Sequence, residues 1–179
     1  ENKPIGFPTD GGPISSYSNL FYWAHAIAKS DSTIGLHPHK GFEIITYVIS
    51  GSIKHFDTLI QKWIELKEGD IQLIQSGKGI SHSEFLKKDC SIFQIWFDPN
   101  IKETLFEEPK YKDYKSTLFK VNKGKKTIIG EGSFLKIKSE GIEMFELELT
   151  EDVVLNLNSQ KIYSIYLLSG KISIKEKEI

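Results

Sequence analysis

Two short segments of this chain carry pairs of metal-binding side chains at the same spacing. His37 and His39 form the first pair, and His82 and Glu84 form the second, with the members of each pair two residues apart. In an extended strand, side chains at positions i and i+2 leave the same face. If the two segments lie on neighbouring strands, three imidazoles and one carboxylate point into one small volume. The spacing therefore predicts a single site for a divalent transition metal.

The chemistry of these side chains restricts the metal only in part. Three neutral imidazoles and one carboxylate, without a thiolate, suit Fe, Mn, Co, Ni, Cu or Zn. Four ligands out of six would leave two adjacent positions for water, dioxygen or a chelating substrate, whereas a closed tetrahedral zinc site would leave none. No histidine follows His82 in the sequence, so we expect one metal ion per chain.

Other polar residues near the two pairs leave the identity of the fourth ligand open. We expect Glu43 to face the same way as the first histidine pair, where it competes with Glu84 as a ligand or orients a histidine from behind. His55 and Asp57 are also two residues apart, and they fit a polar rim near the opening of the site. His25 lies among apolar residues and fits a structural role or a place behind the ligands.

Short strands must position these side chains, because the apolar pattern has a period of two almost throughout. β-branched and aromatic residues are abundant, and glycine-containing breaks separate the apolar runs. This pattern predicts an all-β fold, a double-sheet jelly roll. The expected strands cover 19–28, 42–50, 52–57, 63–66, 71–75, 81–85, 91–97, 117–121, 127–130, 134–139, 143–149, 153–157, 162–168 and 171–175.

An acidic, proline-containing connection divides these strands into two groups. We expect an N-terminal metal-binding lobe over residues 1–110 and a C-terminal metal-free lobe over residues 111–179, with one helical turn within residues 102–114. The second lobe has fewer strands than the first. Either residues 1–17 cross over and complete its second sheet, or the chain is shorter than its relatives.

Composition excludes several classes of partner. The 179 residues carry 23 basic and 24 acidic side chains, a formal net charge of -1, so no global field attracts nucleic acid or an anionic membrane. The single cysteine, Cys90, cannot form an internal disulfide. No apolar run approaches the roughly 20 residues that span a bilayer, and no signal-peptide pattern is visible. We expect a cytoplasmic protein.

The segment from residue 33 to residue 98 resembles the pirin family, whose members are bicupins. Residues 37–43, His-Pro-His-Lys-Gly-Phe-Glu, are similar to the pirin signature His-Pro-His-Arg-Gly-Phe-Glu, and residues 69–72 with 77–84 are similar to the second pirin motif. The resemblance implies a cupin double-stranded β-helix in two lobes, the second shorter than is usual in the family. It also implies one iron ion per chain, held by His37, His39, His82 and Glu84.

The resemblance implies two alternative functions. Some bacterial pirins resemble quercetin 2,3-dioxygenases in activity, which implies a flavonol-like substrate that is opened oxidatively, with Glu84 or Glu43 accepting the hydroxyl proton. Pirins also resemble regulatory proteins in which the oxidation state of iron alters a surface that binds protein partners. A third interpretation is a cupin whose metal is structural.

Overall fold

The computed structural model describes residues 1–7, 9 and 11–173, and the chain divides into two compact units, residues 1–148 and 149–179. Every helix and strand assigned in the described residues belongs to the first unit. They are β1 (Asn2–Ile5), β2 (Leu20–Ile27), β3 (Ser32–His39), β4 (Glu43–Ser50), β5 (Ser52–Asp57), β6 (Ile64–Lys67), β7 (Ile71–Gln75), β8 (Ile80–Leu86), β9 (Ser91–Phe97), α1 (Ile101–Thr104), β10 (Lys110–Tyr114), the 3₁₀ helix η1 (Ser116–Leu118), β11 (Val121–Asn122), β12 (Lys125–Ile129) and β13 (Met144–Leu147).

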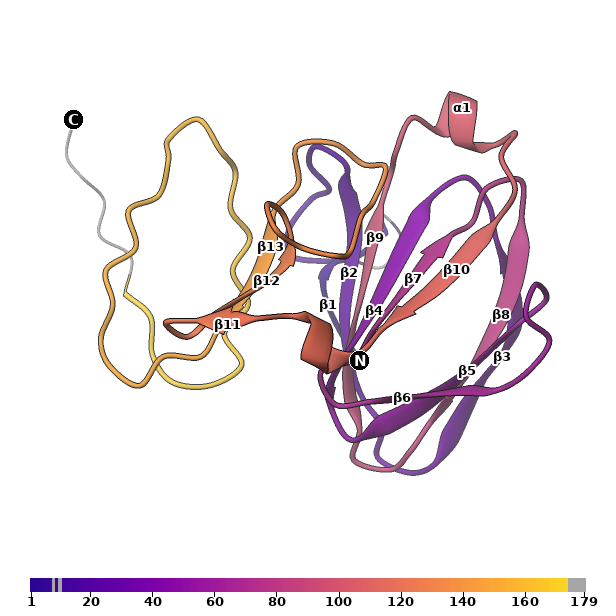
Figure 1. Cartoon of the computed structure of the whole chain (residues 1–179), viewed down its shortest axis with the longest axis horizontal. Helices are drawn as coiled ribbons and strands as arrows, with labels where there is room; N and C mark the ends of the chain where they lie inside the picture. The colour runs from indigo at the N-terminus through magenta and orange to yellow at the C-terminus, as the bar shows by residue number, and fades with distance from the viewer. Residues whose placement is uncertain (8, 10, 174–179) are drawn as a thin grey trace. The chain divides into compact units, whose positions relative to one another are not determined.

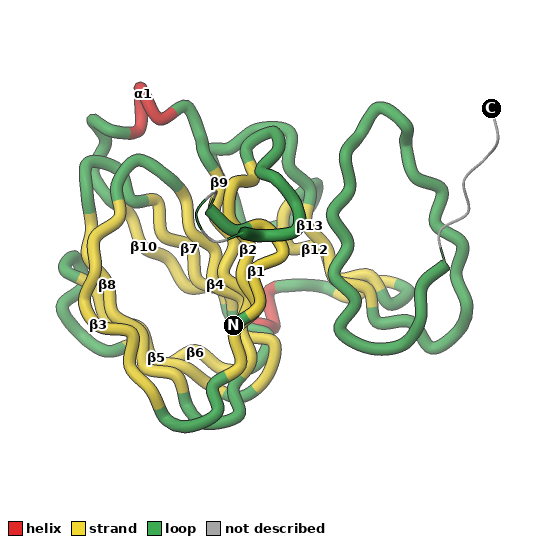
Figure 2. Tube along the Cα trace, turned by 180° about the vertical axis from the view of Figure 1, so that it is seen from behind, coloured by secondary structure: helices red, strands yellow, loops and turns green. Residues whose placement is uncertain are grey.

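Two antiparallel sheets form the body of the first unit. One has six strands in the order β1-β2-β9-β4-β7-β10, and the other has four in the order β3-β8-β5-β6. Figures 1 and 2 show the two sheets facing each other, with the strands of one opposite those of the other. This arrangement confirms the predicted all-β, double-sheet architecture.

The interior between the two sheets contains two apolar clusters with a polar layer between them. One cluster includes Val48 from β4 and Ile53 from β5, and the other includes Ile44 from β4 and Ile80 from β8, so each joins both sheets. Thr46 shares a face with its neighbours on β4 at i-2 and i+2, and it is fully buried. Thr46 therefore places a polar side chain between the two apolar clusters.

The outer face of the six-stranded sheet is covered by the chain that follows η1. Tyr47 points outward from β4, and its hydroxyl donates to Glu146 Oε2 on β13 over 2.6 Å. Lys126 Nζ on β12 donates to the same hydroxyl and to the same carboxylate, at 2.7 and 2.6 Å. The small sheet β11-β12-β13 is thus attached to the back of the sheet that forms one wall of the interior.

The N-terminal segment pairs differently from expectation, whereas the division into two lobes stays a prediction. Strand β1 pairs with β2 at the edge of the six-stranded sheet, so the predicted crossover of residues 1–17 to the second lobe is wrong. Strand β10 runs across the predicted boundary at residue 110 and pairs with β7. The six-stranded sheet therefore includes residues on both sides of that boundary, and the two compact units of the chain divide after residue 148.

Residues 149–173 contain no assigned strand, although the sequence predicts strands over 153–157 and 162–168. Their apolar side chains are exposed, Val154 by 87% and Ile162 by 69%. A period-two apolar pattern specifies a strand only where partner strands accept its backbone hydrogen bonds. The predicted strand over 134–139 is likewise absent from the described residues, and the one over 171–175 extends beyond them.

Helices are few and short among the described residues. The predicted helical turn within residues 102–114 is present as α1. No helix among the described residues is long and apolar enough to cross a membrane. The cytoplasmic location stays a prediction.

The packing of β6 against the interior predicts the effect of a core truncation. Leu66 is fully buried in the same apolar cluster as Ile53, so Leu66→Ala should lower the free energy of unfolding by about 2–5 kcal/mol. Leu59→Ala, at a side chain that is 51% exposed, should change it by less than about 0.5 kcal/mol. Urea denaturation followed by tryptophan fluorescence measures both, and equal losses would contradict this assignment of the core.

Candidate metal centre

The pairing of β3 with β8 brings the predicted histidines together. His37 lies directly opposite His82, and His39 lies opposite Ile80, with a register shift just before His37. Strand β3 is at the edge of its sheet. Pro38 has no backbone N–H to donate to a neighbouring strand, and an edge strand tolerates this because one of its sides has no partner. The predicted strand pairing is therefore present, although the apolar pattern did not predict β3 itself.

The three imidazoles converge through their Nε2 atoms. His82 Nε2 lies 2.9 Å from His39 Nε2 and 3.0 Å from His37 Nε2. One ligand atom from each ring lies within 4.8 Å of the others, which makes these three residues a group that could hold a metal ion. Two metal–nitrogen bonds of about 2.1 Å at a right angle place their nitrogens about 3.0 Å apart. The observed separations fit a metal bound by adjacent coordination positions.

Local contacts orient His37 and keep His39 and His82 neutral. The carbonyl of Gly35 lies 2.8 Å from His37 Nδ1, which donates to it, so Nε2 is the ring nitrogen that is left to bind a metal. Burial, with the neighbouring histidines, lowers the pKa of His82 to about 2 and that of His39 to about 4. Neutral rings with free Nε2 lone pairs are the form that binds a metal.

Glu84 lies on the same face of β8 as His82, but outside the group of three histidines. Its carboxylate accepts from Thr46 Oγ1 at 3.3 Å and from Gln94 Nε2 at 3.0 Å. Burial raises its pKa, an effect that His37 and these two hydrogen bonds oppose. Among the described residues it has no ion pair with a basic side chain. A buried carboxylate without a counter-charge is costly, and a cation at the histidines would reduce that cost.

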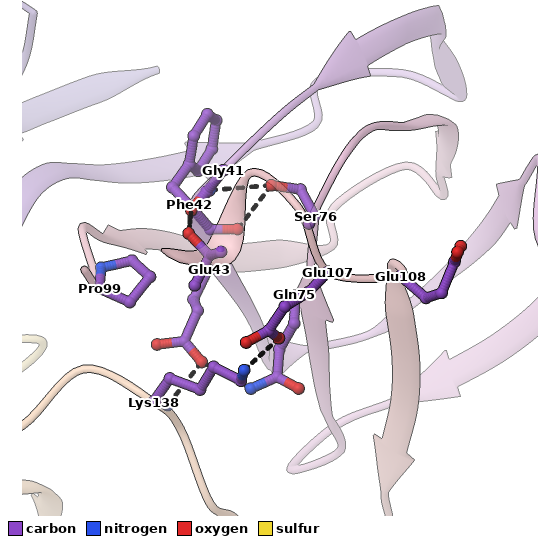
Figure 3. Close-up of a pocket in the computed structure, with 11 residues that line it drawn as sticks. Gly41, Phe42, Glu43, Gln75, Ser76, Pro99, Glu107, Glu108 and Lys138 are labelled. Carbon is purple, nitrogen blue, oxygen red and sulfur yellow. Dashed lines mark hydrogen bonds and ion pairs between the residues drawn. The ribbon is translucent and has the colours of Figure 1, made fainter. Parts of the chain in front are cut away.

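Glu43 has a different role from the one expected. Figure 3 shows its side chain directed toward Lys138 and Gln75. Its carboxylate accepts from Gln75 Nε2 and the Lys138 backbone N–H, both at 2.7 Å, and from the N–H and hydroxyl of Ser139 at 2.9 and 2.8 Å. The expectation that Glu43 faces the histidines is wrong, because the turn at Gly41, with φ of 90°, separates the face of β4 from that of β3.

His55 and Asp57 are inside the molecule and do not form a rim. Both side chains are fully buried, and His55 Nε2 lies 2.7 Å from Asp57 Oδ2. Both share a face of β5 with Ile53, which belongs to the core. The two-residue spacing from the apolar Ile53 is the feature of the sequence that could have predicted that His55 and Asp57 point inward. His25 lies apart from the group, with its Nε2 2.7 Å from Ser91 Oγ, as a structural role requires.

Aromatic rings flank the histidines on one side, a feature that the sequence reasoning missed. The His39 ring lies 5.4 Å from that of Phe42 and 5.1 Å from that of Trp96, measured between centroids. Phe42 and Trp96 are themselves stacked, with centroids 5.0 Å apart and planes 27° apart. The centre therefore combines imidazole nitrogens that could hold a metal ion, a buried acid and an aromatic wall formed by Phe42 and Trp96.

Comparisons with known proteins agree with this geometry. The family model described as Pirin matches residues 16–97, which include all three histidines and Glu84. The chain is 40% identical over 81 residues to Pirin-1 of Arabidopsis thaliana, covering 45% of this chain and 28% of that protein. It is 27% identical over 157 residues to the quercetin 2,3-dioxygenase of Escherichia coli K12, covering 83% and 64%.

A solved structure supports the fold. The bacterial pirin YhhW of Escherichia coli, in complex with nickel(II), is 26% identical and covers 80% of this chain and 61% of its own, with a TM-score of 0.65. The predicted cupin architecture is thereby confirmed over about four fifths of the chain. This chain spans less than two thirds of the length of each of these three relatives.

The outward direction of Glu43 predicts that its substitution affects folding and not metal binding. Glu43→Gln replaces one accepting oxygen by an amide that faces N–H donors, which should lower the free energy of unfolding by about 1–3 kcal/mol. The metal content per folded chain should stay at the wild-type value in elemental analysis. Loss of the metal from a folded Glu43→Gln protein would contradict the observed geometry.

Proposed function

The chain belongs to the pirin family of the cupin superfamily, and we propose that it is a quercetin 2,3-dioxygenase-like enzyme with one mononuclear metal site. The ligands are His37, His39, His82 and Glu84. The observation that carries the proposal is the convergence of three imidazole Nε2 atoms at separations that suit one ion. Glu84 supplies the negative charge that this ion needs nearby.

The metal that we propose is iron, on the basis of the family resemblance. Three imidazoles and a carboxylate also suit other divalent transition metals, and the related pirin of Escherichia coli was solved with nickel(II). A bound redox-active ion would supply Lewis-acid polarisation of substrate oxygens and a means of reaction with dioxygen. The remaining contributions come from the side chains of this protein.

Glu84 is the proposed general base. It shares a face of β8 with His82, and its two hydrogen bonds leave lone pairs on the carboxylate that can accept a proton. Thr46 and Gln94 hold the carboxylate in place from the opposite sheet. In a flavonol-like substrate, the acidic proton is that of the 3-hydroxyl beside the carbonyl. Glu84 would accept this proton as the substrate binds.

The aromatic wall determines the class of substrate that we propose. Phe42 and Trp96 present stacked rings beside His39. Planar aromatic ligands gain from stacking on such rings and from exclusion of water around them. A flavonol combines a planar ring system with adjacent hydroxyl and carbonyl oxygens, so it matches both the wall and the metal.

Removal of single histidines tests the metal site. His37→Ala, His39→Ala and His82→Ala should each lose the metal, whereas His25→Ala, a histidine outside the group, should retain it. A metal at 100 times its dissociation constant stabilises a folded protein by about 2.7 kcal/mol, so added metal should raise the melting temperature of wild type and of His25→Ala only. Full metal occupancy in His37→Ala or His82→Ala would reject this ligand set.

A glutamate-to-glutamine substitution, as at Glu43, also tests the role of Glu84. Glu84→Gln should weaken metal binding by about tenfold or more, because it removes the buried charge beside the histidines. Chelator competition with the metal-loaded proteins measures this affinity. If Glu84→Gln binds the metal as wild type does, Glu84 is not a ligand, and its role would be confined to proton transfer.

Oxygen consumption tests the reaction itself. The iron-loaded protein should take up dioxygen when quercetin is added, and His82→Ala should not. Metal binding without uptake across a panel of flavonols and other enediols would exclude the dioxygenase. Redox-dependent retention of a protein partner would then support the alternative function, a regulator that responds to the oxidation state of its metal.

A further inference from the structure

His55 and His82 lie beside each other inside the barrel, and each has one ring nitrogen without a partner. Strand β5 pairs with β8 so that Asp57 lies opposite His82 and His55 lies opposite Glu84. The two rings have centroids 5.5 Å apart and planes 48° apart. Both Nδ1 atoms are buried without a hydrogen-bond partner among the described residues. A buried polar atom left unpaired costs about 1–3 kcal/mol, so a partner for each is expected.

The proton position on His55 is fixed by Asp57. Asp57 Oδ1 accepts the backbone N–H groups of Leu59 and Ile60 at 2.8 and 2.6 Å, which holds the carboxylate in one orientation. Its Oδ2 lies 2.7 Å from His55 Nε2. A carboxylate can only accept, so the His55 proton is on Nε2 and its Nδ1 offers a lone pair. Tyr111 stacks on His55, with centroids 4.4 Å apart, and keeps the ring in place.

The proton position on His82 is the opposite when the metal is bound. Its Nε2 faces the Nε2 atoms of His37 and His39, where an ion would take the lone pair. The remaining proton of the neutral ring must then be on Nδ1, which becomes a donor. His82 therefore offers a donor, and His55 offers an acceptor, in the same buried space.

We propose that His55 and Asp57 are positioning residues for His82, in a line that runs from Asp57 through His55 and one bridging water to His82 Nδ1. This inference rests on the proposed three-histidine metal site. A buried water needs two to four polar partners. Gln72 can supply a third from the opposite sheet, because both polar atoms of its buried amide lack a partner among the described residues.

The direction of Gln72 follows from strand register. It lies between Thr46 on β4 and Asp113 on β10 in the same row of the six-stranded sheet. Thr46 bonds to Glu84, and Asp113 accepts from Tyr111, so the row faces the interior. The line of contacts would hold the His82 ring in place and increase its basicity as a ligand, as such partners do in other metal sites.

Asp57→Asn tests this line, because it should reverse the proton on His55. The two backbone N–H groups at Leu59 and Ile60 hold the side-chain oxygen, so the amide NH₂ must face His55 Nε2. The His55 proton then moves to Nδ1, so the bridging water must accept from both histidines, and the chain of hydrogen bonds from His82 through the water to the Asp57 carboxylate is broken. The affinity for Zn²⁺ should fall by about 10–100-fold in chelator competition. Asp70→Asn is the matched control, since Asp70 is 4% exposed and accepts the backbone N–H groups of Lys67 and Ser116 elsewhere.

Nitrogen-15 NMR of the zinc-loaded protein reads the proton positions directly. In wild type, His55 should be protonated on Nε2 and His82 on Nδ1, and in Asp57→Asn the His55 proton should be on Nδ1. Wild-type His55 protonated on Nδ1 would overturn the inference without any variant. Wild-type affinity in Asp57→Asn would overturn it too, while the metal site itself would stand. A wild-type chain that binds no Zn²⁺ would remove the proposed function together with the inference.

Discussion

The register of β3 against β8 is the constraint on which the metal centre depends. Side chains alternate between the two faces of a strand, so a slip of one residue would turn the histidines of one strand to the outside. The register shift between Ile34 and His37 sets the position of His37 opposite His82, and the carbonyl of Gly35 within that segment orients its ring. The N–H of Gly41 donates to the carbonyl of Gly77 over 2.9 Å, which ties together the turns that follow β3 and precede β8.

A polar layer between two packed sheets is costly wherever its members are unpaired, and apolar neighbours offset that cost. Unpaired buried polar groups are costly, and here Thr46 and Gln94 bond to Glu84 while Asp57 bonds to His55. The apolar clusters on either side offset the remaining cost, because each buried Leu or Ile contributes about 1.5–3 kcal/mol. Hydrogen bonds therefore hold Glu84 and His55 in position, and the apolar layers supply the free energy that offsets the burial of the polar groups.

The sequence predicted the histidine group well, because spacing at i and i+2 needs only a locally extended chain. It did not predict β3, whose Gly35 and Pro38 interrupt the apolar pattern, nor the direction of Glu43, because a turn at Gly41 resets the alternation of faces. Strand β10 is rich in lysine and tyrosine, and it is a strand because β7 accepts its hydrogen bonds. Such features depend on partners distant in sequence, which local patterns do not specify.

The two buried glutamates show how strand alternation separates stability from chemistry. The carboxylate of Glu43 accepts four hydrogen bonds, which nearly saturates its oxygens and ties residues 138 and 139 to the outer face. That of Glu84 accepts two, one of them at 3.3 Å, so lone pairs and charge remain available to a cation or a proton. Both lie within the same fold and are equally hidden from solvent. Their difference arises from the face on which each side chain leaves its strand, and only the inner face meets the histidines.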